Sequence, residues 1–308
     1  MPVFKPSIPI YLSNSYLQDL NRCERYFQLR HLLQGNDKKE DTPATMLGSA
    51  FGIGIAEYLY SRNKNQAILK TWLAYKEEYQ DDRRNVWVCI NLLLSAIPYM
   101  DNLLLDWKVV EFDNKPAIEL SFKLQIDSQF FYAGHVDVCL QNLWTGKYAV
   151  LDAKTTGMNI LDLDPLYKNS NQTVGYSILL DAIVGKDLAE YDVLYFIGRL
   201  GSGTGFEPSI EIKTYPKTLH DRLDWFLSIG LDVERLKRMI TLNTFPKREK
   251  GCLYYNKPCI FFSTCNLYAL DTYKTDEQLS KLGLIEGEEF QFTFHMDELI
   301  KSHLERIA

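Results

Sequence analysis

Two carboxylates and one lysine stand near the ends of neighbouring apolar segments of the sequence. His135 and Asp137 alternate along one strand-like run, and Asp152 and Lys154 alternate along the next. Side chains two residues apart point to the same face of a strand, so each pair shares a face, and a hairpin would bring the pairs together. Taken alone, an Asp-x-Lys pair is more typical of a surface salt bridge. Beside Asp137, the same pair could instead bind a metal ion.

Metal-assisted phosphodiester hydrolysis is the chemistry that uses such a trio. Mg²⁺ and Mn²⁺ prefer oxygen ligands, keep several waters, and lower the pKa of a bound water while they stabilise charge on phosphate. Asp137 and Asp152 would supply the ligands. Lys154 would orient or deprotonate the attacking water and offset the phosphate charge. The sequence therefore predicts a magnesium or manganese site.

Apolar periodicity predicts the elements that would carry these side chains. Residues 117–126 alternate between apolar and polar positions, as a half-buried strand does. Further runs predict a three-strand meander, a helix and another strand after a helical N-terminal third. The predicted strands are 117–126, 130–140, 147–154, 191–198 and 209–215, and the predicted helices are 13–33, 46–79, 82–105, 166–184 and 218–242. This order predicts an α/β fold.

Three short motifs resemble those of a known enzyme family. GHVD at 134–137, DAKTT at 152–156 and QTVGY at 172–176 resemble the G-x-x-D, D/E-x-K and Q-x-x-x-Y series of the PD-(D/E)XK nucleases, specifically their RecB-like branch. The resemblance extends over about residues 11–268. It implies a restriction-endonuclease-like core, with a mixed central sheet flanked by helices, a helical N-terminal region and a C-terminal cysteine-bearing iron–sulfur region.

The resemblance also implies roles for individual residues. In the family the two acids bind metal, the lysine is catalytic, and the glutamine and tyrosine lie near the site and the DNA. It assigns these roles to Asp137, Asp152, Lys154, Gln172 and Tyr176. Glu119 resembles a further acidic residue of that branch, and His135 is a predicted DNA contact.

The sequence departs from the family at one position. Many members carry a metal-binding His on the first helix in a G-x-x-x-H context, and Gly52 stands where that His would be. Glu57, a helical turn further on, could supply a carboxylate instead, although an exposed helix Glu is more often only solvated. Loss of the His favours a site with fewer protein ligands, or an enzyme with weak or no activity.

Three cysteines fall within fourteen residues near the C-terminus. Cys252, Cys259 and Cys265 are separated by six and five residues, too close together for three unrelated core cysteines. Four thiolates suit an iron–sulfur cluster and also zinc, so the number of ligands does not choose between them. In the iron–sulfur nucleases the fourth ligand is a lone Cys of the first helix, which Cys23 resembles. The resemblance thus implies a structural [4Fe-4S] cluster rather than zinc.

Basic residues surround the C-terminal cysteines. Arg238, Lys247, Arg248 and Lys250 could hold a DNA backbone through phosphate contacts, and a solvated helix end is the equal alternative. We divide the chain into a helical region over 1–110, a nuclease core over 111–216, a helix with the metal-cluster loop over 217–270, and an acidic tail over 271–308.

Composition limits the class of protein. The chain has 308 residues, 46% hydrophobic and 24% charged, as expected of a folded protein rather than a disordered one. Its net charge of −6 argues against a bulk basic clamp for nucleic acid. The N-terminus lacks a secretory signal, and the most apolar stretch, 86–100, is interrupted by polar residues and predicts a buried helix rather than a membrane anchor. Cys89 and Cys139 lie in apolar runs and are predicted core residues.

Together these features predict a metal-dependent deoxyribonuclease in the cytoplasm of a bacterial, archaeal or phage-infected cell. The resemblance implies an exonuclease that acts on DNA ends or single strands in recombination, repair, phage DNA processing or CRISPR adaptation. The chain has no nucleotide-binding P-loop, so a helicase, a recombination protein or a CRISPR integrase would be its partner. The alternative is an iron–sulfur DNA-binding or assembly protein that keeps the nuclease fold without turnover.

Overall fold

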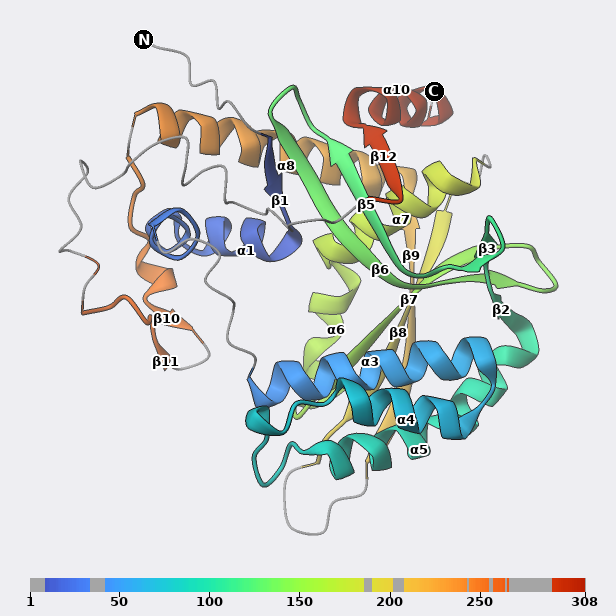
Figure 1. The fold of residues 1–308 in the computed structure, drawn as a ribbon. Helices are drawn as coiled ribbons and strands as arrows, with labels where there is room; N and C mark the ends of the chain where they lie inside the picture. Colours follow the sequence, from blue (N-terminus) through green and yellow to red (C-terminus); the bar gives the residue numbers. More distant parts are fainter. Residues whose placement is uncertain are drawn as a thin grey trace. The chain divides into compact units, whose positions relative to one another are not determined.

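A computed structural model of the chain describes residues 9–33, 42–185, 190–201, 208–242, 244–254, 257–263, 265 and 290–307. The chain forms two compact units (Figure 1). Unit 1 comprises Met1–Lys39, Ser121–Gly134 and Leu223–Ala308, and unit 2 comprises Glu40–Leu120 and His135–Arg222. The predicted nuclease residues lie in unit 2 and the four predicted cluster cysteines lie in unit 1.

Unit 2 contains a mixed sheet. Strand β7 (Tyr148–Thr156) pairs antiparallel with the second half of β6 (Phe130–Asn142) and parallel with β8 (Glu190–Arg199). Strand β9 (Ser209–Thr218) is antiparallel to β8, and the short β2 (Trp107–Val109) is antiparallel to the end of β6. A small hairpin, β3 (Glu111–Phe112) and β4 (Lys115–Pro116), follows β2.

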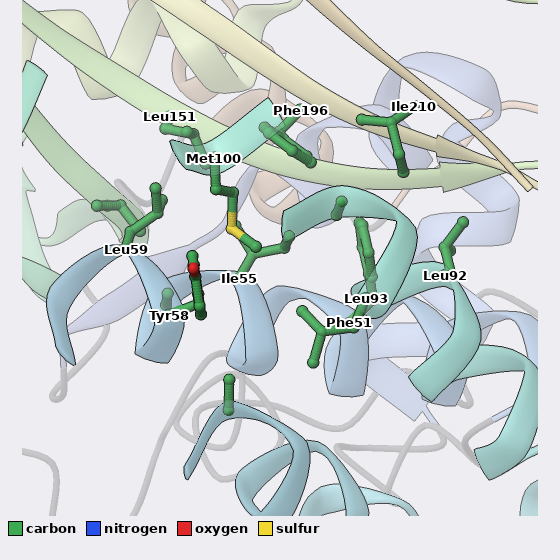
Figure 2. Close-up of a cluster of buried hydrophobic side chains, with 14 of the residues drawn as sticks. Phe51, Ile55, Tyr58, Leu59, Leu92, Leu93, Met100, Leu151, Phe196 and Ile210 are labelled. Carbon is green, nitrogen blue, oxygen red and sulfur yellow. The ribbon is translucent and has the colours of Figure 1, made fainter. Parts of the chain in front are cut away.

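Three helices cover one face of this sheet. Helices α3 (Pro43–Ser61), α4 (Lys64–Ala74) and α5 (Val86–Asp106) lie together, and α3 packs against β7 (Figure 1). Figure 2 shows the core that they form with the sheet. Its members include Phe51 and Ile55 of α3, Leu93 of α5, Leu151 of β7 and Phe196 of β8. Because these strand residues are apolar at alternate positions, they direct one face of β7 and β8 to the helices.

The connection between β7 and β8 covers the other face. It contains α6 (Ile160–Lys168) and α7 (Asn171–Val184), as a crossover between parallel strands requires. Val193, Tyr195 and Ile197 alternate with the residues of the first core and pack with Ile160 of α6. The periodicity predicts one helix over 166–184, but the chain turns at Asn169 and Ser170, and the helix begins afresh at Asn171.

Helix α5 is the one described helix that is long and apolar enough to cross a membrane. It meets this description by length and composition only, with 21 residues and a mean hydropathy of 1.6 in its most apolar part. Cys89, Leu92, Leu93, Ala96 and Met100 are fully buried in the core of unit 2. The structure thus agrees with the buried helix that the polar interruptions predict.

The long helical run predicted over 46–79 is also divided. Arg62 has a left-handed backbone with a φ of 53°, which ends α3, and Asn63 caps the start of α4 by accepting hydrogen bonds from Asn65 and Gln66. Apolar periodicity on both sides of a left-handed residue cannot reveal this break, because periodicity does not depend on φ at a single position.

Unit 1 begins with a broken helix. The sequence predicts one helix over 13–33, but the structure has α1 (Asn14–Arg22), α2 (Glu24–Phe27) and a π-helical turn, Gln28–Leu33. The break is at Cys23, whose φ of −166° and ψ of 117° are extended. An extended residue between two helices directs its side chain differently from the helical positions on either side.

Unit 1 contains further strand segments, which belong to the same eight-stranded sheet. Strand β1 (Ile10–Leu12) is parallel to the first half of β6, and β12 (Phe292–His295) is parallel to β5 (Ile118–Gln125). Helix α8 (Leu219–Thr241) and the terminal helix α10 (Met296–Ile307) accompany these strands. The sequence predicts only an acidic tail there, so β12 and α10 correct that expectation; residues 271–289 lie outside the described residues.

Candidate active site

The hairpin of β6 and β7 brings Asp137 and Asp152 together. Regular pairing of the two strands ends at Val138 and Leu151. Directly beyond it, Oδ2 of Asp137 accepts a hydrogen bond from the main-chain N–H of Ala153 at 3.1 Å. Asp152 directly precedes Ala153 on β7 and is fully buried. Both carboxylates therefore lie directly beyond the point where the pairing of β6 with β7 ends.

Lys154 lies against the second carboxylate. Its Nζ atom lies 2.9 Å from Oδ2 of Asp152 and donates a hydrogen bond to Oδ1 at 3.1 Å. Asp152 and Lys154 share one face of β7 because they are two residues apart. The salt bridge that a solvated Asp-x-Lys pair would form is thus present, but its acidic partner is buried rather than exposed.

Helix α7 supplies the next contacts. Nζ of Lys154 donates a hydrogen bond to Oε1 of Gln172 at 3.3 Å, and Nε2 of Gln172 donates one to the hydroxyl of Tyr176 at 2.6 Å. Gln172 and Tyr176 are four residues apart and therefore lie on one face of the helix. The motif residues form a continuous chain from Tyr176 to Asp152.

The two aspartates resist full ionisation. Burial and the neighbouring charge of Asp152 together raise the pKa of Asp137 to about 7, against the opposing charge of Lys154. Burial also raises the pKa of Asp152, against the charge of Lys154. Burial lowers the pKa of Lys154, but the two aspartates outweigh it and leave the pKa above its ordinary value. Additional positive charge at this place would stabilise the ionised carboxylates.

These donors fit a hard divalent cation. Oδ2 of Asp152 is buried and accepts no hydrogen bond from any described residue, although Nζ of Lys154 is close. Mg²⁺ commonly uses one or two protein carboxylates and takes its other ligands from water and substrate. Within the described part of the chain, no three His, Cys, Asp or Glu side chains form a group suited to a metal ion. Asp137 and Asp152 would thus be a two-carboxylate site.

Glu119 and His135 lie near this centre. The charge of Glu119 contributes to the raised pKa of Asp137. Burial raises the pKa of Glu119 itself, and His135 opposes this rise only in part. Glu119 has a left-handed backbone, with a φ of 51°, inside β5. Such a conformation is strained for a residue with a Cβ, and it interrupts the alternation of the strand at the acidic residue.

Helix α3 places its glycines on the opposite face of β7. A Cβ at Gly52 would lie 3.8 Å from Cβ of Ala153, and a Cβ at Gly48 would lie 3.3 Å from Oγ1 of Thr155. Ala153 and Thr155 alternate with Lys154, so position 52, where the family resemblance leads us to expect a His, faces the far side of the strand. Glu57 lies elsewhere on α3, with its carboxylate 3.1 Å from Nζ of Lys70.

Two tyrosines at the site were not predicted from sequence. The hydroxyl of Tyr195 lies 3.0 Å from Oγ1 of Thr173, and the rings of Tyr167 and Tyr195 are 4.6 Å apart. Burial raises the pKa of both, and the charges of Asp152 and Lys154 act on both. Tyr195 of β8 is the strand partner of Asp152 of β7. The sequence does not indicate this, because an aromatic residue in an apolar run is typical of the core.

The predicted cluster cysteines gather in unit 1. Sγ of Cys23 accepts a hydrogen bond from the main-chain N–H of Arg248 at 3.4 Å, and the N–H of Cys259 donates to the carbonyl of Cys252 at 2.8 Å. Burial raises the pKa of Cys265, and the charges of Cys23 and Cys259 raise it further. The four thiols are free, and their sulfur donors suit iron or zinc. No three of them form a metal-binding group in the described residues.

The other two cysteines and the basic residues are placed separately. Cys89 and Cys139 are fully buried in the core, as predicted. Arg248 forms two hydrogen bonds, of 2.6 and 2.7 Å, with the buried carboxylate of Glu24. The remaining predicted DNA contacts of this region, Arg238, Lys247 and Lys250, are exposed.

Comparisons with known proteins found a family match over most of the chain and one solved structure of limited similarity. The family model of the PD-(D/E)XK nuclease superfamily matches residues 11–266. A crystal structure of a protein from Eubacterium rectale, named as a candidate exonuclease, is 14% identical and superposes with a TM-score of 0.46 over 82% of this chain and 92% of that chain. No curated protein sequence matches the chain. The family match covers most of the chain and includes every motif residue described above, and the chain therefore belongs to the PD-(D/E)XK nuclease superfamily.

Proposed function

We propose that this nuclease hydrolyses DNA phosphodiester bonds with Mg²⁺ or Mn²⁺, as an exonuclease on DNA ends or single strands. The observation that carries the proposal is the convergence of Asp137, Asp152 and Lys154 in unit 2, with Lys154 held by Gln172. Paired acids beside a lysine are the set that metal-assisted phosphodiester hydrolysis uses.

Each residue would have a distinct task. Asp137 and Asp152 would hold the cation, which when bound lowers the pKa of a water and stabilises charge on the phosphate. Asp137 is oriented by the N–H of Ala153, and Asp152 is fixed by its burial and by Lys154. These contacts reduce the reorganisation that binding would otherwise need.

Lys154 would act as a cation rather than as a base. Its raised pKa keeps the ammonium group protonated near neutral pH, despite the opposing effect of burial. A protonated Lys154 can donate hydrogen bonds to the scissile phosphate or to the attacking water, and it can offset negative charge. Gln172 would fix the direction of the ammonium group, and Tyr176 would fix Gln172.

We further propose that Cys23, Cys252, Cys259 and Cys265 hold a [4Fe-4S] cluster that stabilises unit 1. The free thiols, the contact of Cys23 with the main chain of Arg248, and the charges of Cys23 and Cys259 that act on Cys265 support this assignment. Anaerobically purified protein would then be brown and contain about four irons per chain, the number in such a cluster. A Cys259→Ser variant would lose the colour, whereas a Cys89→Ser variant would keep it. A colourless protein with stoichiometric zinc would contradict the assignment.

A digestion assay tests the nuclease proposal. Linear duplex, linear single-stranded, circular and end-blocked DNA are incubated with Mg²⁺, with Mn²⁺ or with EDTA. We expect metal-dependent loss of linear substrates with free ends and survival of the circular ones. Cleavage of circles at the same rate would contradict the exonuclease assignment. Binding without cleavage in either metal would favour the catalytically inactive alternative.

A further inference from the structure

Unit 1 presents a group of partly exposed aromatic rings on one face of its strands. Strands β1, β6, β5 and β12 lie side by side in this unit (Figure 1). The ring of Tyr11 stacks on that of Phe131 at 5.3 Å between centroids and on that of Phe290 at 5.6 Å. The three side chains are only partly buried, so ring surface remains open to solvent.

A lysine lies among these rings. Nζ of Lys123 is 5.8 Å from the ring centroid of Phe131 and 5.5 Å from that of Phe290. Within the described residues it forms no ion pair with a carboxylate. The cation therefore interacts with ring faces, and no carboxylate of the described residues neutralises its charge.

The rings do not belong to the main core of unit 1. That core lies on the opposite face of the same strands, where Phe122, Phe130 and Tyr132 are buried. Helix α8 covers this opposite face, because Trp225 of α8 lies 5.1 Å from Tyr132, ring to ring. Side chains alternate along each strand, so Tyr11, Phe131 and Lys123 point away from α8.

The remaining strand positions of the exposed face suit a polyanion. The register of β12 and β5 pairs Thr293 with Lys123 and His295 with Gln125, and all four lie on this face. Among the described residues of β1, β5, β6 and β12 in unit 1, none on this face is acidic. On these described strand positions, a chain of phosphates would meet one lysine, one histidine and neutral polar groups.

We propose that Tyr11, Phe131 and Phe290 form a platform on which unpaired bases of single-stranded DNA stack, with Lys123 beside the backbone. Stacked rings next to a cation are the chemistry that binds single strands without sequence preference. Paired bases of a duplex are already stacked on one another and are not free to use the platform. This inference rests on the proposed function, and it names the form of DNA that the nuclease binds.

Fluorescence anisotropy with a labelled oligothymidylate in EDTA tests the platform. Tyr11→Ala and Phe131→Ala should each raise Kd about fivefold or more, the range that one base stack supplies. Lys123→Gln should raise Kd and reduce its dependence on salt concentration. Tyr99→Ala, which removes an exposed ring from α5 in unit 2, is the matched control and should bind as the wild type does.

An oligonucleotide of the same length with abasic sites separates stacking from charge. It should bind weakly to the wild type, and the two ring variants should bind it no less tightly than the wild type. Unchanged Kd values for oligothymidylate in all three variants would overturn the proposal. It would also be overturned if the ring variants lost as much affinity for the abasic strand as for oligothymidylate. Thermal unfolding shows whether each ring variant is folded. If a ring variant is not folded, Lys123→Gln, which retains all three rings, tests the platform in its place. A Lys154→Met variant should lose cleavage and still bind oligothymidylate through the platform, so failure of catalysis and failure of the platform are distinguishable.

Discussion

The carboxylate of Asp137 accepts a hydrogen bond from the main-chain N–H of Ala153, at 3.1 Å, directly beyond the point where β6 and β7 cease to pair. The side chain of Asp137 thus accepts a hydrogen bond from a main-chain N–H that pairing of the two strands would otherwise use. The contact fixes Asp137 beside Asp152 without a further side chain. It also means that the carboxylate geometry depends on the backbone of β7, the strand that carries Lys154.

Gln172 should act as a positioning residue for Lys154. Gln172→Leu removes the acceptor 3.3 Å from Nζ, and the misdirected ammonium group should lower kcat about 10- to 100-fold with little change in KM. Gln172→Glu keeps an acceptor for Lys154 and should retain more activity than Gln172→Leu. Steady-state kinetics on all three proteins check this. Equal kcat in Gln172→Leu and wild type would show that the contact has no catalytic role.

Asp127 should make unit 1 sensitive to acid. Burial opposes ionisation of this carboxylate, but an ion pair with Lys237 and main-chain hydrogen bonds from Gln129 and Phe130 depress its pKa. A depressed pKa stabilises the folded state above the unfolded-state pKa, and this contribution is lost as pH falls through the folded-state pKa. Asp127→Asn should therefore lower Tm by about 2–4 °C at pH 7.

The difference between Asp127→Asn and wild type should shrink below about pH 4, where the carboxylate of the wild type becomes protonated. Thermal unfolding at several pH values measures it. Lys237→Gln should show the same pH dependence, because it removes the other member of the pair. A Tm difference that stays constant down to pH 3 would exclude this ion pair as its source.

Gly251 should be intolerant of a side chain. A Cβ there would lie 2.6 Å from Cβ of Cys23 and 2.9 Å from the carbonyl oxygen of Arg22, neither of which is the end of a flexible side chain. Gly251→Ala should therefore displace Cys23, lower Tm, and reduce the iron bound by the protein. The matched control is Gly230→Ala in helix α8, whose Cβ would meet only Cε of Met296 at 3.9 Å. Gly230→Ala should be neutral or stabilising, because Ala is the better helix former.

The sequence predicts the central geometry well because that geometry follows from local rules. The period of two in a strand places Asp152 and Lys154 on one face, and the spacing of Gln172 and Tyr176 places them on one face of a helix. The five strands β5 to β9 and helix α8 lie close to the predicted ranges, whereas the single helix predicted over 166–184 is divided into α6 and α7. Membership of the nuclease superfamily, which the motifs predict, is confirmed by the family match.

Other features depend on contacts that sequence periodicity does not contain. The extended backbone of Cys23 interrupts a helical pattern that continues on both sides. Strand β12 adds to β5 from a segment distant in sequence, and its four residues are too few to predict a strand. The sequence alone predicts that Tyr195 is a core residue, because an aromatic side chain in an apolar run gives no sign of the charges near its hydroxyl. The roles of Glu119, Glu57 and the basic residues stay predictions.

The most direct test of the nuclease centre is the single-turnover cleavage rate of Lys154→Met with linear DNA in saturating Mn²⁺. Loss of a charge that stabilises the transition state should lower the rate about 100-fold or more in a variant that still folds and still binds DNA. Lys147→Met is the matched control, because Lys147 pairs with Glu190 at 3.0 Å on the exposed surface, and it should cleave as the wild type does. Wild-type cleavage by a folded Lys154→Met protein would contradict the assignment of Asp137, Asp152 and Lys154 as the catalytic centre.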